Sequence, residues 1–289
     1  MAPEVKGFFD KATFTISYVV TDPKTKKAAI IDPVLDYNPR SGRVATASAD
    51  AMLGYIDEKS LEIVWILDTH VHADHLSAVA YLKEKLGVPV GIGANVTKVQ
   101  AHFKKVYNVD TGFKADGSQF DRLLKDGETF KLGELEGRVL YTPGHTEACV
   151  TYVIGDAAFV GDTLFMEDYG TARTDFPGGS AATLYASIHR LYEELAPETR
   201  VFLCHDYGTA ERKEYVWETT LANEREKNVL VREGVSEADY VKARKERDAK
   251  LDAPVLLLPA IQVNMRAGHF PPAESNGVSY LKIPVRKAS

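Results

Sequence analysis

The stretch LDTHVHADHLSA, residues 67–78, most constrains what this chain can fold into, because it places three histidines and two aspartates within nine positions. It is either a polar loop or a metal-binding segment. The preceding run, EIVWILD (62–68), is almost entirely apolar, which predicts a strand buried on both faces. His70 and His72 are two positions apart, so an extended backbone would direct both side chains to one side.

The first half of the chain alternates predicted strands and helices. The expected elements are strands at 13–20 and 28–33, a loop at 36–47, a helix at 49–59, the strand at 62–68, a helix at 76–87, a strand at 88–93 and a helix at 95–107. Each assignment rests on apolar periodicity and on the turn residues between the runs. Such alternation is typical of an α/β architecture.

The second half begins with consecutive strands. We expect strands at 128–133, 135–144, 148–155 and 157–165, then a helix at 180–195, a strand at 200–206, two exposed helices within 211–250 and an apolar segment at 254–264. Gly155-Asp156 is a plausible two-residue hairpin turn with glycine first. No break in composition separates a second domain, so we expect one domain over 1–289, with 211–250 as a helical C-terminal extension packed on it.

Composition excludes several classes of protein. With 35 Lys and Arg against 41 Asp and Glu, the formal net charge is −6, which argues against a nucleic-acid-binding protein. No apolar run reaches membrane-spanning length, and the first twenty residues do not resemble a secretory signal. The two cysteines, Cys149 and Cys204, imply no disulfide framework, so a reducing cytoplasm is the expected location.

Histidines and aspartates recur where predicted strands end, and loops over the ends of a sheet are the usual place for chemistry. The residues concerned, from four separate strand ends, are His70, His72, Asp74, His75, His145, Asp162 and His205. Any one of them could be structural; Asp74, for example, could cap the helix that begins near Leu76. All of them together, with the spacing H-x-H-x-D-H, favour a metal site.

Imidazole and carboxylate ligands without thiolate suit zinc, Fe(II) or manganese. Strand alternation would turn Cys204 away from the face that His205 uses, and Cys149 starts a strand, so both cysteines are expected in the core. His102 and His189 lie in predicted helices and are expected to be packing or surface residues.

The motifs THVHADH, TPGHT, GDTLF and HDY together resemble the metallo-β-lactamase superfamily over residues 10–210. The resemblance implies an αββα four-layer sandwich, an α/β fold that some schemes class as α+β. The segments ARTDFPGGSAATLYASIH, HDYG and QVNMRAG further resemble the persulfide dioxygenase branch, the relatives of the ethylmalonic encephalopathy protein.

This branch implies one Fe(2+) per chain, held by His72, His145 and Asp162 as a facial triad with open positions. The expected reaction is the oxidation by O2 of a low-molecular-weight persulfide, glutathione persulfide above all, to sulfite and a thiol. The remaining candidates, His70, Asp74, His75 and His205, would then orient the ligands and hold water. The alternative is a binuclear zinc thioester hydrolase of the glyoxalase II type, in which the same four residues help bind two metals.

Glutathione carries two carboxylates, so its pocket should offer guanidinium groups. Arg173 is the first candidate and Arg266 the second, while Thr146 and Tyr207 could add hydrogen bonds near the metal. For Arg173 a structural ion pair with an aspartate is an equal alternative. The expected partners are therefore a small persulfide and O2, with no nucleic acid and no membrane; a homodimer is left open.

Overall fold

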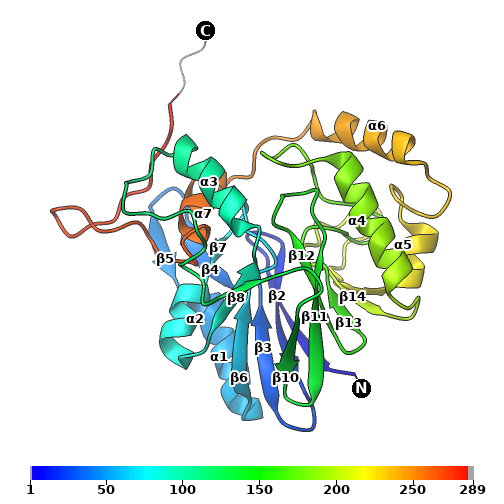
Figure 1. The fold of residues 1–289 in the computed structure, drawn as a ribbon, viewed down its shortest axis with the longest axis horizontal. Helices are drawn as coiled ribbons and strands as arrows, with labels where there is room; N and C mark the ends of the chain where they lie inside the picture. The colour runs from blue at the N-terminus through cyan, green and yellow to red at the C-terminus, as the bar shows by residue number, and fades with distance from the viewer. Residues whose placement is uncertain (1, 286–289) are drawn as a thin grey trace.

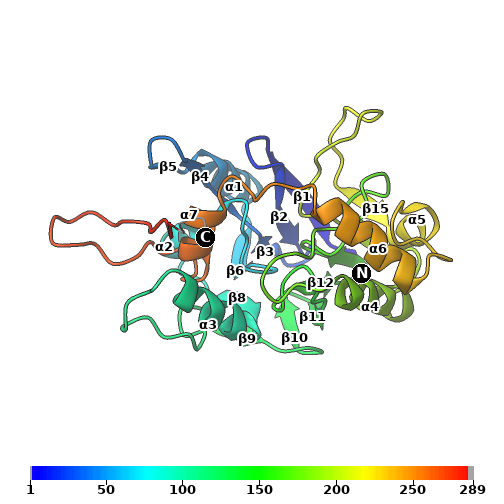
Figure 2. The same cartoon turned by 90° about the horizontal axis from the view of Figure 1, so that it is seen from above.

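The computed structural model describes residues 2–285. Two six-stranded sheets lie face to face at the centre of the molecule, and helices cover the outer face of each (Figures 1 and 2). This is the αββα sandwich that the sequence predicted, and the mixture of helices and sheets makes it an α/β fold.

The first sheet has the strand order β1-β2-β3-β6-β8-β9. Its strands are β1 (Glu4–Asp10), β2 (Thr15–Thr21), β3 (Lys27–Ile31), β6 (Glu62–Leu67), β8 (Val90–Gly93) and β9 (Arg122–Leu124). Strands β1 to β3 pair antiparallel, whereas β3, β6, β8 and β9 run parallel to one another. The parallel strands are joined through helices, as parallel pairing requires.

The second sheet follows chain order, β10-β11-β12-β13-β14-β15. Its strands are β10 (Thr129–Leu132), β11 (Leu135–Tyr141), β12 (Val150–Ile154), β13 (Ala157–Phe159), β14 (Arg200–Phe202) and β15 (Glu218–Thr220). All neighbours pair antiparallel except β13 and β14, which are parallel because α4 connects them.

Three apolar clusters hold the layers together. The cluster between the sheets joins Tyr18 of β2 to Phe159 of β13, whose ring centroids are 5.3 Å apart. A second cluster packs helices on the first sheet, and a third packs helices on the second sheet. The helices are α1 (Ala47–Lys59), α2 (Val79–Leu86), α3 (Val96–Val106) and α7 (Leu257–Asn264) on one side, and α4 (Ala181–Glu194), α5 (Leu221–Lys227) and α6 (Glu237–Asp248) on the other.

The segment expected as a loop at 36–47 differs from the prediction. Strands β4 (Val34–Asn38) and β5 (Arg43–Ala45) form a hairpin there, and β7 (Leu76–Ser77) completes a small third sheet in the order β5-β4-β7. These strands are only five and three residues long and carry little apolar alternation, so the sequence pattern does not reveal them.

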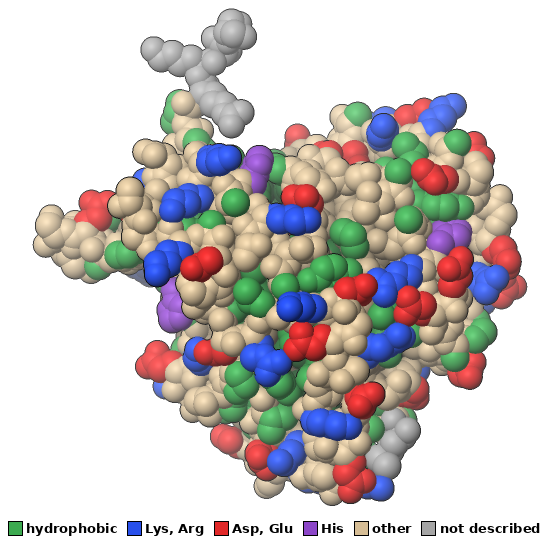
Figure 3. Space-filling model, viewed as in Figure 1, with side chains coloured by type: hydrophobic (Ala, Val, Ile, Leu, Met, Phe, Trp, Pro, Cys, Tyr) green, Lys and Arg blue, Asp and Glu red, His purple; other side chains and the backbone are tan. Residues whose placement is uncertain are grey.

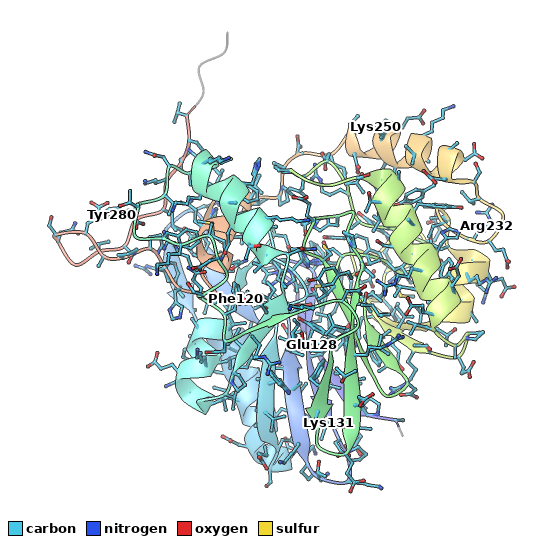
Figure 4. All side chains as sticks on the ribbon, viewed as in Figure 1. Phe120, Glu128, Lys131, Arg232, Lys250 and Tyr280 are labelled. Carbon is cyan, nitrogen blue, oxygen red and sulfur yellow. The ribbon has the colours of Figure 1, made fainter. Side chains whose placement is uncertain are left out.

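Residues 211–250 pack on the second-sheet side, where α6 lies along α4 (Figures 1 and 2). The expected exposed helix is found at α6, but one of its faces is buried through Tyr240, Arg244 and Asp248. In Figure 4, Lys250 lies just beyond the end of α6, and Tyr280 lies on the C-terminal segment that extends away from the layers.

The surface is mixed in charge. On the face shown in Figure 3, basic and acidic side chains are interspersed and form no continuous basic patch. Within residues 2–285, no helix combines the length and the apolar composition that crossing a bilayer requires.

Candidate metal centre

The candidate ligands come from the ends of strands in both sheets. The histidine stretch follows β6 of the first sheet, while His145, Asp162 and His205 follow β11, β13 and β14 of the second sheet. All three of these residues are buried, as are His70 and His72. The face-to-face packing of the sheets therefore brings together side chains that are up to 135 positions apart in the sequence.

One group of possible ligands consists of His70, His145 and Asp162, whose donor atoms lie within 4.8 Å of one another. His145 Nε2 is 3.5 Å from Asp162 Oδ2, and the rings of His70 and His145 are 5.1 Å apart at their centroids. Two imidazoles and one carboxylate on one side of a site are the ligand set of non-haem Fe(II) centres.

The prediction placed His72 with His145 and Asp162, whereas in the structure His72 lies outside this group. Its Nε2 lies 2.9 Å from Oδ1 of Asp32, a buried carboxylate that follows the neighbouring strand β3. His70 takes the predicted place of His72. The two rings lie on one side, 4.1 Å apart, as the spacing implied, but Asp32 fixes the orientation of the second ring.

A second group lies beside the first. His72, Asp74 and His75 have donor atoms within 4.8 Å of one another. His205 Nε2 is 3.4 Å from Asp74 Oδ2 and 3.3 Å from Asp162 Oδ1, so Asp162 lies between the two groups. Asp74 does not cap α2, because the residue at that cap is Ala78.

Buried polar atoms without hydrogen-bond partners are rare in proteins and call for an explanation. Among residues 2–285 there are eight such side-chain atoms, and five belong to this cluster. The five are Nε2 of His70, Nδ1 of His72, Nε2 of His75, Oδ1 of Asp162 and Nε2 of His205. These five atoms have lone pairs that no protein donor uses, and their concentration at one place is what a metal-binding site requires.

The charges of the cluster also suit a cation. Burial lowers the pKa of His70 and His72 well below the usual value, so both are neutral and able to bind metal. Burial opposes ionisation of Asp74, yet the neighbouring His205 and His75 outweigh it and hold the pKa of Asp74 well below its usual range. For His205, burial is outweighed by Asp162 and Asp74, which raise its pKa.

Three groups that were not predicted from the sequence orient the ligands, as partners of metal-binding residues commonly do. His145 Nδ1 is 2.8 Å from the carbonyl oxygen of Arg173, and His205 Nδ1 is 3.2 Å from that of Phe14. Asn264 of α7 donates from Nδ2 to the carbonyl oxygens of His72 and His75, at 2.9 and 2.7 Å. The motif QVN that ends α7 is the sequence signal for Asn264.

Gly144 controls the placement of His145. Its φ is +140°, which L side chains rarely adopt, and a Cβ there would overlap the backbone of Leu184 in α4. Only glycine lets the loop after β11 pass this close to α4, so the TPGHT motif has a steric reason for its glycine.

Cys204 differs from its prediction. Its Sγ lies 3.7 Å from Asp32 Oδ2, and it belongs to groups with His72 and with His205 instead of facing away. The backbone is irregular after Phe202, where β14 ends, so strand alternation does not extend to this position. Burial raises the pKa of the thiol well above its usual value, which favours the neutral thiol over the metal-binding thiolate.

A cavity of about 330 Å³ opens beside the first group. Asp74, His145 and Asp162 form its polar floor. The lining also contains five aromatic residues and three arginines, which are Phe14, Phe165, Tyr169, Phe176, Tyr207, Arg173, Arg244 and Arg247. A concave, mostly apolar pocket with a few convergent polar groups is the usual form of a small-molecule site.

The predicted substrate residues divide into two pairs. Arg173 and Tyr207 line this cavity, although Arg173 also makes the ion pair with Asp175 that was the alternative reading. Thr146 is not among the lining residues, and its hydroxyl oxygen contacts Cys149 Sγ at 3.0 Å. Arg266 lines a different cavity and pairs with Asp110 at 3.3 Å, so its predicted place in the substrate pocket is wrong.

Residues 11–205 match the family described as "Metallo-beta-lactamase superfamily", and the chain belongs to it. It is therefore an enzyme of that superfamily, with the metal-binding site of the superfamily.

The proteins that resemble this chain carry different names. It is 53% identical over 291 residues to a protein of Burkholderia pseudomallei named "Probable metallo-hydrolase", covering 97% of this chain and 98% of the other. It is 48% identical to "Glyoxylase B2" of Dictyostelium discoideum, covering 98% and 97%. It is 31% identical over 205 residues to the human mitochondrial "Persulfide dioxygenase ETHE1", covering 70% and 68%.

The crystal structure of ETHE1 from Myxococcus xanthus superimposes with a TM-score of 0.73 at 29% identity, covering 92% of this chain and 100% of that one. Sequence and structure thus both support the persulfide dioxygenase branch that the motifs indicated.

Proposed function

We propose that this protein is a persulfide dioxygenase that uses one Fe(2+) held by His70, His145 and Asp162. The overall reaction is RSS⁻ + O2 + H2O → RSH + HSO3⁻, with glutathione persulfide as the substrate. The observation that carries the proposal is the group of two imidazoles and one carboxylate whose donor atoms lie within 4.8 Å of one another. When bound, Fe(2+) supplies the redox chemistry by which O2 oxidises the terminal sulfur of the persulfide.

The residues around the group would prepare it for this chemistry. The carbonyl of Arg173 accepts a hydrogen bond from His145 Nδ1–H, which leaves Nε2 as the lone-pair nitrogen facing the metal. His70 Nδ1 contacts the hydroxyl of Thr69, which Asp32 holds in turn, and this leaves His70 Nε2 free. Three protein ligands leave positions for both substrates, which a closed four-ligand site does not.

The cavity supports a thiol-derived substrate. Phe165, Phe176 and Tyr207 give it an apolar wall beside the carboxylate and imidazole floor. Such a wall excludes water from a reactive sulfur anion, and water exclusion strengthens the electrostatic interactions within the site.

A second candidate is a binuclear zinc hydrolase that acts on a thioester. The unpartnered Nε2 atoms of His75 and His205, beside Asp74, favour it because they provide ligands for a second metal. The names of the relatives from Burkholderia pseudomallei and Dictyostelium discoideum agree with this reading. When bound by these residues, two zinc ions would supply the Lewis acidity that activates water for hydrolysis.

Metal analysis and oxygen uptake separate the two candidates. The protein is purified without oxygen, its metals are quantified, and glutathione persulfide is added in an oxygen electrode. We expect about one iron per chain and one O2 consumed per sulfite formed. Two zinc ions per active chain, with thioester hydrolysis and no oxygen uptake, would refute the dioxygenase proposal.

A further inference from the structure

Three arginines line the cavity, and two of them are already neutralised. Arg173 donates from Nε and Nη2 to the two carboxylate oxygens of Asp175, at 2.7 and 2.8 Å. Arg244 is buried and pairs with Asp248, with an Nη2 to Oδ1 distance of 2.6 Å. These two guanidinium groups therefore have their charge satisfied by the protein itself.

Arg247, one turn of α6 beyond Arg244, differs from both. Its guanidinium carbon lies 4.4 Å from the centroid of the Tyr169 ring, and its Nη1 donates to the Tyr169 carbonyl oxygen at 2.7 Å. In the part of the chain from residue 2 to 285, no carboxylate lies within 4.0 Å of it. A guanidinium has five N–H groups, so most of its donors remain available to a ligand.

The position of Arg247 suits recognition of the far end of a substrate. It lines the same cavity as His145 and Asp162, together with several aromatic side chains. Stacking on Tyr169 holds the guanidinium plane in place, which reduces the entropy lost when it binds a ligand. A ligand with its sulfur at the metal group and a carboxylate at its other end complements this arrangement.

We propose that Arg247 binds a carboxylate of the substrate and thereby selects thiols that carry one. The inference rests on the proposed function only in taking the substrate to be a thiol derivative, which holds for both candidate reactions. Arg247 was not among the predicted site residues, since it lies in a helix whose composition is that of an exposed one.

The test is calorimetric titration of the purified protein with glutathione and with glutathione diethyl ester, whose carboxylates are both blocked. The wild type should bind glutathione about 10- to 100-fold more tightly than the diester, the range expected for a charge-assisted hydrogen bond. Arg247→Met should remove that difference by weakening glutathione binding alone. Arg247→Lys keeps the positive charge but lacks the planar guanidinium group. Its affinity for glutathione should lie between those of the wild type and the Arg247→Met variant.

Lys245→Met is the matched control, because Lys245 is an exposed cation on the same helix. It should bind both ligands as the wild type does. Equal affinity of the wild-type protein for glutathione and the diester would overturn the proposal without any variant. Unchanged glutathione binding by a folded Arg247→Met protein would do the same. Neither result depends on which metal is bound. The test of Arg247 can therefore fail or succeed independently of the iron and oxygen measurements that test the proposed function.

Discussion

At the scale of single residues, Asp32 decides what the histidine stretch can do. Its carboxylate accepts hydrogen bonds from the backbone N–H and the hydroxyl of Thr69, at 2.7 and 2.9 Å, and contacts His72 at 2.9 Å. Its own φ is +50°, an uncommon conformation for a residue other than glycine. Strain of this kind persists where the surrounding contacts fix one conformation, and here they fix the loop that carries the ligands.

His70 and His72 are therefore expected to respond differently to substitution. His70→Ala removes a ligand of the proposed iron group, so bound metal should fall by at least about tenfold at equal free metal, as even changes outside the ligand set cost 10- to 100-fold. His72→Ala should retain one iron per chain. Metal content after dialysis against a buffered iron solution measures the difference.

His102→Ala is the control for both variants, because His102 is exposed on α3 and should have no effect. Equal loss of metal from the His70 and His72 variants would mean that both histidines bind one cation. The metal site would then include His72 as well as His70, His145 and Asp162.

The ligand residues could be predicted from sequence, but the role of each could not. Spacing and strand ends identified His70, His145 and Asp162 as members of one cluster. Asp32 contacts Nε2 of His72 and leaves Nδ1 without a partner, and no local pattern records this contact between residues 40 positions apart. Arg266 was misplaced for the same reason, since its partner Asp110 is 156 positions away.

At the scale of elements, α5 carries a buried acid. Glu224 is fully buried, its Oε1 has no hydrogen-bond partner within the described chain, and burial raises its pKa well above the usual value. Between the unfolded pKa and this raised value, the folded state binds a proton that the unfolded state lacks. Stability therefore falls as pH rises, by roughly 1.4 kcal/mol per pH unit across that window.

Glu224→Gln should remove this loss, because an amide cannot ionise and keeps the shape of the side chain. We expect the variant to be more stable than the wild type at pH 8, by about 1–3 kcal/mol, and to differ little from it at pH 4. Urea unfolding at both pH values measures the change. Glu226→Gln, an exposed neighbour in the same helix, should change neither value by more than about 0.5 kcal/mol.

A Glu224 variant that loses stability at pH 8 would contradict this reading. It would show that the ionised carboxylate is held favourably, with Asn228, whose Nδ2 lies 2.7 Å from Oε2, as the main partner.

Helices that are rich in charged residues but bury one face were predicted least well. The α6 sequence is dominated by charged residues, which is typical of an exposed helix, yet Tyr240, Arg244 and Asp248 form a buried stripe at intervals of four. Periodicity analysis follows apolar residues, so a stripe in which two of three members are ionised escapes it. Burial of that pair depends on hydrogen bonds to Thr171 and Thr174, which are remote in sequence.

At the scale of the whole molecule, the metal centre joins the two sheets. His70 comes from the first sheet, and His145 and Asp162 come from the second. The layer order was predicted through the resemblance, and the family match and the structural neighbours confirm it. Strand order within each layer had no comparable signal, because it depends on pairings between distant segments.

Removal of metal should therefore destabilise the whole fold and not one loop. A metal present at a thousandfold excess over its Kd stabilises the folded state by about 4 kcal/mol, so chelation should lower Tm by roughly 8–16 °C. Differential scanning calorimetry with and without a chelator measures the shift. The His70→Ala protein should show a much smaller shift, and an equal shift in both proteins would place the stabilising metal elsewhere.

The helix α6 reaches the pocket from a stretch of chain that contains none of the candidate ligands. If Arg247 binds the carboxylate, α6 adds one contact to a pocket in which other lining residues, such as Arg173 and Tyr207, lie in the same part of the chain as the ligands. Substitutions confined to α6 would then change which thiol binds without changing the metal ligands. The fold could in this way acquire specificity for a different substrate.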